Sequence, residues 1–187
     1  ARLLLVYPDY TDRDCQRRVS GGNYNEGLAS ISAVLKEGGH HVGLLHLLNL
    51  HTEADFKARL LEMNEKDGGY DIIGFSIRTT AFPDCIEYIK WTKEVLPDAF
   101  VICGGYHCTL VADEVLAVDG VDCVCVGDGE YAELELCDKM RDGEDYLNVE
   151  SLYFKLDDGS FKKNPIRPLF ADLDRIPIPD FELFDYD

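Results

Sequence analysis

The chain has 187 residues, of which 46% are hydrophobic, and its 18 basic and 36 acidic side chains give a formal net charge of −18. This apolar content predicts a folded domain, and the negative charge excludes nucleic acid and anionic membranes as partners, because both bind basic surfaces. No apolar run is as long as a membrane span and no signal-peptide pattern opens the chain, so we expect a cytoplasmic protein.

Apolar runs alternate with amphipathic segments over most of the chain. In chain order they predict a strand over 2–8, a helix over 25–40, a strand over 41–47, a helix over 52–66, a strand over 70–78, a helix over 83–96, a strand over 99–105, a short helix over 109–118, a strand over 121–129 and a helix over 130–140. The strands lack inside–outside alternation and each is followed by a helix. We therefore predict an α/β domain over 1–145, built on a doubly wound five-stranded parallel sheet that is Rossmann-like or flavodoxin-like.

The pattern changes after residue 145. Residues 149–164 alternate around Asp158-Gly159, which predicts a C-terminal β-hairpin. Residues 165–187 carry four prolines and no helical period, which is typical of an extended linker. We assign 146–187 as a hairpin and a connector, and we expect the chain to be one part of a longer protein.

The candidate site lies in the loops that follow the strands, because ligands of doubly wound sheets bind outside the carboxyl ends of the strands. These predicted loops are 8–24, 48–52, 79–82, 104–108 and 127–130. The first is long and polar, which is typical of a lid or a binding segment. A receiver domain is disfavoured, because the third strand ends in Arg78-Thr79 where such a domain needs Asp, and the fifth ends in Gly127-Asp128 where it needs Lys.

The stretch VICGGYHCTL, residues 101–110, holds three metal-binding residue types, Cys103, His107 and Cys108. A structural zinc site needs four ligands, and no second cluster completes this set. The seven cysteines of the chain lie mostly in apolar runs and predict buried thiols more than metal ligands or disulfides. The pair Gly104-Gly105 is more informative, since it lets the backbone turn sharply and lets a flat ligand come close.

Two other loops carry weaker signals. Ser76, Thr79 and Thr80 supply hydroxyl groups that either hydrogen-bond a ligand or cap the next helix. Gly127, Gly129 and Ala132 match G-x-G-x-x-A between a strand and a helix, but a dinucleotide fingerprint belongs after the first strand and not after the fifth. The start of that helix can still receive polar groups of a ligand.

Together these loops resemble a known family, the cobalamin (B12)-binding domain at the N-terminus of B12-dependent radical SAM enzymes. The segment DIIGFSIRTTAFPDCIEYIKWTKEVLPDAFVICGGYHCT is similar to the family region in which one strand ends in Ser/Thr and the next in Gly-Gly-x-His. NEGLASISAVLKEGGHHVGLL resembles its first helix and second strand, VDCVCVGDGEYAELEL its fifth-strand loop, and PLFADLDRIPIPDFELFD the connector to the radical SAM domain.

The resemblance implies a corrin ring over the carboxyl edge of the sheet and a nucleotide tail in a cleft between strands. It implies that the cofactor is held by small and polar loop residues rather than by charge, and it carries no catalytic residue and no protein metal ligand onto this chain. By position it assigns cofactor contacts to Ser76, Thr79, Thr80, Gly104, Gly105, His107, Gly127, Gly129 and Glu130. Tyr10, Arg13 and Arg78 are further candidates for the lower face of the ring.

Two motifs are absent from the sequence. No Asp has a His two residues later, so the D-x-H-x-x-G motif whose His binds cobalt in related domains is missing, and we expect base-off cobalamin without a His lower ligand. The motif C-x-x-x-C-x-x-C is missing as well, so the [4Fe–4S] cluster and S-adenosylmethionine would belong to the rest of a parent methyltransferase, and the isolated chain would not be catalytic. The residues also leave open a flavin- or nucleotide-binding domain, or a regulatory module without a cofactor.

Overall fold

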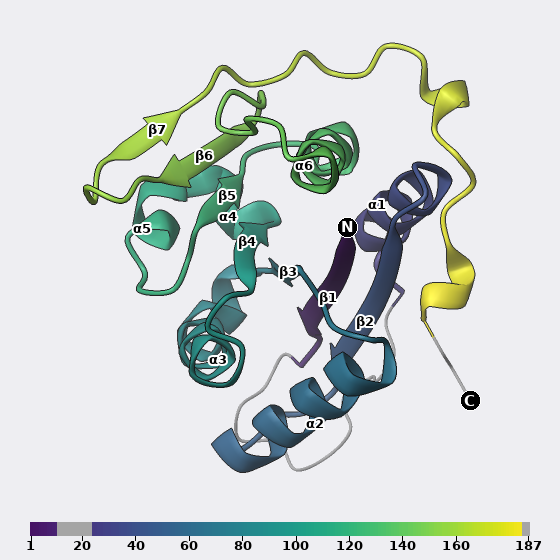
Figure 1. Cartoon of the computed structure of the whole chain (residues 1–187). Helices are drawn as coiled ribbons and strands as arrows, with labels where there is room; N and C mark the ends of the chain where they lie inside the picture. The colour runs from purple at the N-terminus through teal and green to yellow at the C-terminus, as the bar shows by residue number, and fades with distance from the viewer. Residues whose placement is uncertain (11–23, 185–187) are drawn as a thin grey trace.

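The computed structural model describes residues 1–10 and 24–184, in which seven strands form one sheet with the order β2-β1-β3-β4-β5-β6-β7 (Figure 1). These strands are β1 Arg2–Pro8, β2 His41–Leu47, β3 Ile72–Ser76, β4 Phe100–Gly104, β5 Cys123–Cys125, β6 Leu152–Lys155 and β7 Phe161–Lys163. Strands β1 to β5 are parallel, whereas β6 and β7 are antiparallel and extend the sheet beyond β5. The predicted five-stranded parallel sheet and the hairpin are confirmed, and the hairpin belongs to the same sheet.

Helices cover both faces of the sheet, as Figure 1 shows. They are α1 Glu26–Glu37, α2 Glu53–Lys66, α3 Phe82–Val95, α4 Tyr106–Leu110, α5 Ala112–Leu116 and α6 Glu130–Asp142. The apolar sides of α1 and α6 pack on one face, and those of α2, α3 and α5 pack on the other. None of the helices in the described ranges is both long and apolar enough to cross a membrane.

The strand order reverses next to β1. The chain leaves β1 for the edge strand β2 and then crosses back to β3 on the other side of β1. The helices that start after β1 and after β3 therefore leave from neighbouring strands toward opposite faces, which opens a crevice above the carboxyl ends of these strands. Residues of the predicted loops 104–108 and 127–130 come together at this edge.

Local sequence explains where most of these elements start and stop. Asn25 caps α1 by accepting a hydrogen bond from Leu28 N at 3.0 Å, and Thr52 caps α2 in the same way. The helix predicted over 109–118 is instead two short helices, α4 and α5, that meet at Val111, whose φ of −136° is not helical. The strand predicted over 121–129 ends early, because the chain turns at Gly127 with a φ of +88°.

The connector lies on the domain and does not extend away from it. In Figure 1 the yellow segment after β7 passes α6 and then α1, and two single 3₁₀ turns interrupt it, Leu173–Arg175 and Phe181–Leu183. Asp180 fastens it to α1: its backbone N donates to Ala29 O at 3.0 Å and its carboxylate accepts from Ser32 Oγ at 2.6 Å. Phe184 is buried at its end.

Candidate functional site

A cavity of about 540 Å³ opens at the carboxyl ends of β1, β3, β4 and β5, on the side of the sheet that α1 and α6 cover. Its floor is a row of neighbouring residues, since Leu5 pairs with Gly74 and Gly74 with Ile102 in the strand register. A Cβ on Gly74 would stand 3.2 Å from Leu5 Cδ2. The absence of a side chain at this position therefore leaves space at the base of the cavity. The strands thus supply an apolar base, and the loops above it supply the polar groups.

The turn after β4 is locked to the end of β3. Ile77 N donates to Gly104 O at 2.8 Å, and His107 N donates to Ile77 O at 3.3 Å. Gly105 has a φ of +99°, and a Cβ there would lie 3.0 Å from Ile77 O. Glycine is required at this position both for the left-handed backbone and for the close approach of two chain segments. Gly104 differs, because the nearest atom to its Cβ would be Cys125 Cβ at 3.8 Å, an ordinary van der Waals contact, so a Cβ fits there without a clash.

Thr109 joins the turns after β4 and β5. Its hydroxyl donates to Gly105 O at 3.3 Å and accepts from Gly127 N at 3.1 Å. Gly127, with its positive φ, and Gly105 therefore hold a fixed spacing across the mouth of the cavity. This bridge orders two glycine-rich loops that share no regular secondary structure.

Glu133 is the buried acid of the cavity wall. It lies in the first turn of α6, is 7% exposed, and its Oε2 has no hydrogen-bond partner among the described residues. Burial raises the pKa of this carboxyl to about 8, with a further contribution from the nearby charge of Glu130. Gly129 makes room for it, since a Cβ there would stand 3.1 Å from both Glu133 Oε1 and Ile31 Cδ1.

Arg78 is anchored at the end of β1. Its Nη2 donates to Pro8 O at 2.8 Å and lies 3.5 Å from Asp9 Oδ1, while its guanidinium lies 5.6 Å from the centroid of the Tyr7 ring. Asp9 is buried and also accepts from Tyr7 Oη at 3.2 Å and contacts His46 Nε2 at 3.1 Å. Arg78 thereby compensates a buried carboxylate and still lines the cavity, where its buried Nε has no partner among the described residues.

The structure brings seven of the predicted site residues to the cavity lining: Ser76, Arg78, Gly104, Gly105, Gly127, Gly129 and Glu130. Thr79 and Thr80 are exposed in the 3₁₀ turn Thr79–Ala81, outside the lining. His107 is buried beside that turn, with Nδ1 3.2 Å from Thr79 Oγ1 and its ring 4.3 Å from that of Phe82.

Of the other two predicted contacts to the lower face of the ring, the structure describes only Tyr10 and places it elsewhere. Tyr10 is in the core, where its hydroxyl donates to Asp84 Oδ2 at 3.1 Å and lies 3.0 Å from Tyr88 Oη, and burial raises its pKa. Arg13 lies outside the residues that the structure describes.

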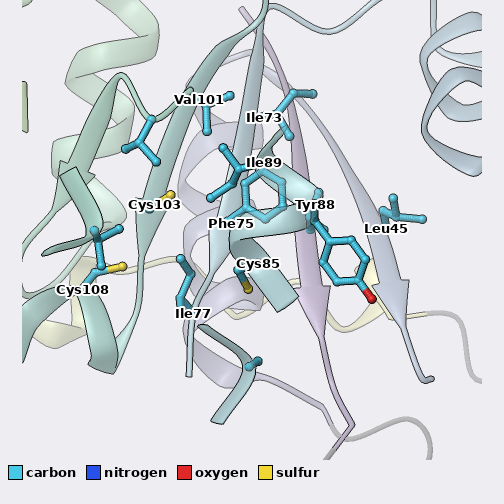
Figure 2. Packing of buried hydrophobic residues seen from close by; sticks show 14 of the residues in the cluster. Leu45, Ile73, Phe75, Ile77, Cys85, Tyr88, Ile89, Val101, Cys103 and Cys108 are labelled. Carbon is cyan, nitrogen blue, oxygen red and sulfur yellow. The ribbon is translucent and has the colours of Figure 1, made fainter. Parts of the chain in front are cut away.

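The thiols of the glycine-loop segment belong to the core on the opposite face of the sheet. Figure 2 shows Cys103 and Cys108 near Cys85 and Ile77, and all four belong to one hydrophobic cluster. Burial raises the pKa of Cys108 to about 12, so this thiol stays protonated at neutral pH. Within the described part of the chain no cluster of three His, Cys, Asp or Glu residues is arranged to hold a metal ion.

Several residues of the cavity were missed by the sequence reasoning. The sequence does contain a signal for Glu133. It falls on the same helical face as Ala132, Leu136 and Cys137, and this pattern predicts that its side chain is buried. Tyr7 and Asn25 line the cavity from β1 and from the N-cap of α1, and Thr109 lines it from α4. No local pattern marks Thr109, because its role depends on two glycines that are distant from each other in sequence.

Comparisons with known proteins agree with this geometry. A family model described as "B12 binding domain" matches residues 18–137. The chain is 28% identical over 187 residues to the uncharacterized methyltransferase PH0819 of Pyrococcus horikoshii, covering all of this chain and 39% of that protein. It is 29% identical over 117 residues to the hopanoid C-3 methylase of Methylococcus capsulatus, covering 61% of this chain and 22% of that protein. The chain thus spans well under half the length of these relatives.

Two solved structures have the same fold. The radical S-adenosylmethionine methyltransferase TsrM from Kitasatospora setae, with cobalamin and a [4Fe-4S] cluster bound, matches with a TM-score of 0.71 and 20% identity over 91% of this chain and 30% of that chain. The cobalamin-dependent S-adenosylmethionine radical enzyme OxsB, with aqua-cobalamin and S-adenosylmethionine bound, matches with a TM-score of 0.76 and 16% identity over 97% and 24%. In both, the match occupies less than a third of a longer chain.

Proposed function

Because the chain belongs to the B12 binding domain family, we propose that it binds cobalamin over the carboxyl ends of β1, β3, β4 and β5. The corrin ring lies on the glycine loops, and the nucleotide tail enters the cavity. We further propose that residues 1–145 are the cofactor module of a longer radical SAM methyltransferase and that 146–187 connect it to the radical SAM domain. S-adenosylmethionine and a [4Fe–4S] cluster belong to that other domain.

The observation that carries this proposal is the cavity with its rim of small residues. A large amide-bearing macrocycle needs a flat approach and hydrogen-bonding groups more than charge. Gly104, Gly105 and Gly127 carry no side chains at the rim, and a Cβ on Gly104 would meet no atom closer than 3.8 Å. Two buried polar atoms at the lining, Glu133 Oε2 and Arg78 Nε, have no partner among the described residues. The residues present therefore fit the cofactor.

The positions of the five histidines favour base-off binding without a His lower ligand. All five lie in the part of the chain that the structure describes, and none of them lines the cavity. His40, His41 and His46 contact Asp138, Asp67 and Asp9, and His107 contacts Thr79. The backbone N of His51 donates to Tyr88 Oη at 3.2 Å.

In the parent enzyme, bound cobalamin supplies methyl-transfer chemistry that side chains lack. The chain positions the cofactor: the loop of Gly104 and Gly105 sets how closely the ring approaches the sheet, and the Thr109 bridge holds the loops together. We place the enzyme in the cytoplasm, a reducing compartment that keeps its buried thiols free.

The test is direct binding. The purified chain is mixed with hydroxocobalamin and desalted, and its visible spectrum is recorded. We expect retained cobalamin with a base-off spectrum. A colourless protein that retains a flavin or a dinucleotide instead would overturn the proposal, and a His-ligated or base-on spectrum would overturn the base-off assignment.

A graded pair of variants tests the placement of the ring. Gly104→Ala adds one carbon, which meets no atom closer than 3.8 Å, and Gly104→Leu adds a full side chain at a position that lines the cavity. We expect thermal stability to change little in either variant and cobalamin affinity to fall with side-chain size, by more than about 10-fold in Gly104→Leu. Unchanged affinity in both variants would move the ring away from this loop.

A further inference from the structure

Glu133 has a feature that packing does not explain. An ionisable side chain buried to this degree and left without a partner for Oε2 is costly. Such groups in folded proteins have a reason, which is often a ligand. Glu133 lines the cavity on α6, where the other buried side chains, Ala132, Leu136 and Cys137, are small or apolar.

The surroundings keep this carboxyl neutral. On its own helix it faces Glu130 and Cys137, from β5 it faces Cys123 and Cys125, and near α1 it faces the aliphatic side chain of Ile31. No cation in the described part of the chain forms an ion pair with it, and its pKa is raised to about 8. At neutral pH the group therefore carries a proton and can donate a hydrogen bond as well as accept one.

The size of the cavity limits what reaches Glu133. A volume of about 540 Å³ holds a group of drug-like size and is too small for a whole corrin with its amide side chains. Only an arm of the ligand can enter. The nucleotide tail of cobalamin is such an arm, and its ribose oxygens and the ring nitrogen of its base accept hydrogen bonds.

We propose that Glu133 donates a hydrogen bond to the nucleotide tail of bound cobalamin and thereby makes the chain prefer complete cobalamin over forms that lack the tail. This inference rests on the proposed function, because it takes cobalamin as the ligand. It adds a determinant of selectivity that is separate from the glycine loops. The loops contact the corrin ring, which both forms share, whereas Glu133 contacts the nucleotide tail, which only complete cobalamin has.

The experiment compares cobalamin with cobinamide, which keeps the corrin ring and lacks the nucleotide. Dissociation constants are measured by titration calorimetry for the wild-type chain and for Glu133→Gln, Glu133→Met and Glu135→Gln, from about pH 6.5 to about pH 9.5. Glu135→Gln is the matched control, because Glu135 lies on the same helix, pairs with Arg167 and is not part of the cavity lining. Thermal melts of each variant check that it is folded.

We expect the wild-type chain to prefer cobalamin, and we expect this preference to fall about 10-fold as the pH rises through 8 and the proton of Glu133 is lost. Glu133→Gln keeps a donor, so its preference stays within about 3-fold of wild type at neutral pH and does not change with pH. Glu133→Met loses about 10-fold of the preference and binds cobinamide as wild type does.

Two results would overturn the inference while cobalamin binding stands: equal losses for both ligands in Glu133→Met, or a preference that Glu133→Met leaves unchanged. A wild-type chain that binds neither ligand would overturn the proposed function, and this inference with it.

Discussion

At the scale of single residues, the strongest conflict with ordinary packing is the carboxyl of Glu133. In the folded chain it keeps its proton up to a pH near 8, whereas in the unfolded chain it ionises in the usual range of glutamate. Between these values the folded state binds more protons than the unfolded state. The contribution of this group to the free energy of unfolding is therefore greatest at low pH. It decreases as the pH rises through this window and is constant above it.

We expect Glu133→Gln to remove this decline and to raise the free energy of unfolding of the cofactor-free chain at about pH 8 by about 2 kcal/mol. Urea unfolding at a series of values from about pH 5 to about pH 9 measures the difference. The same slope of stability against pH in both proteins would show that Glu133 does not titrate with a raised pKa.

Gly105 is a second residue whose identity the backbone dictates. We expect Gly105→Ala to cost roughly 2–3 kcal/mol, because it combines a left-handed φ of +99° with a Cβ only 3.0 Å from Ile77 O. Gly143→Ala is the control, since Gly143 has a φ of +71° and no neighbouring atom within 4 Å of its Cβ, so it incurs only the backbone cost of about 1 kcal/mol. Chemical unfolding compares the two, and equal costs would mean that the contact with Ile77 relaxes freely.

At the scale of elements, the site depends on how the ends of separate strands are tied together. Thr109→Val keeps the shape of the side chain and removes the hydroxyl that joins Gly105 O to Gly127 N. Because Thr109 is exposed, we expect stability to change by less than about 0.5 kcal/mol and cobalamin affinity to fall about 5-fold. Thr52→Val, at the cap of α2 and outside the cavity lining, is the control and should cost stability without changing affinity. An unchanged dissociation constant for Thr109→Val would show that the loops keep their positions without the bridge.

At the scale of the whole molecule, the connector is a bound part of the domain. Phe184 is 3% exposed and meets the rings of Tyr7, Tyr24 and His46 edge-on, with centroid distances of 6.4, 5.4 and 5.6 Å. Tyr7 also lines the cavity, so the connector contacts a residue of the candidate site. This contact links the connector to the candidate site.

We expect Phe184→Ala to release the connector, at a cost of about 2 kcal/mol, because a buried aromatic side chain loses its contacts while the segment around it can relax. Hydrogen exchange at the amide of Asp180, which is bonded to Ala29 O, should accelerate. Ile178→Ala, at a position 82% exposed on the same segment, should leave that exchange unchanged. Protection of the Asp180 amide in Phe184→Ala equal to wild type would show that Asp180 alone holds the connector.

Much of this protein follows from local sequence, because each strand and helix carries its own pattern. The apolar runs predict five parallel strands, Asp158-Gly159 predicts the hairpin, and glycines at strand ends predict where a ligand can approach. Two of the predicted loops, 104–108 and 127–130, meet at one cavity, because parallel strands present their carboxyl ends at the same edge.

The tertiary structure alone decides which side chains from those loops share a space. It turns Tyr10 into the core toward Asp84 and Tyr88, and it leaves Thr79 and Thr80 outside the cavity lining. It also brings Thr109 between two glycines and places Glu133 on the cavity wall. These contacts join segments that are far apart in sequence, and no local pattern encodes a distance between two elements. The sequence determined the sheet, its edge and the glycines of the site, and the packing of helices and loops around that edge decided its polar contacts.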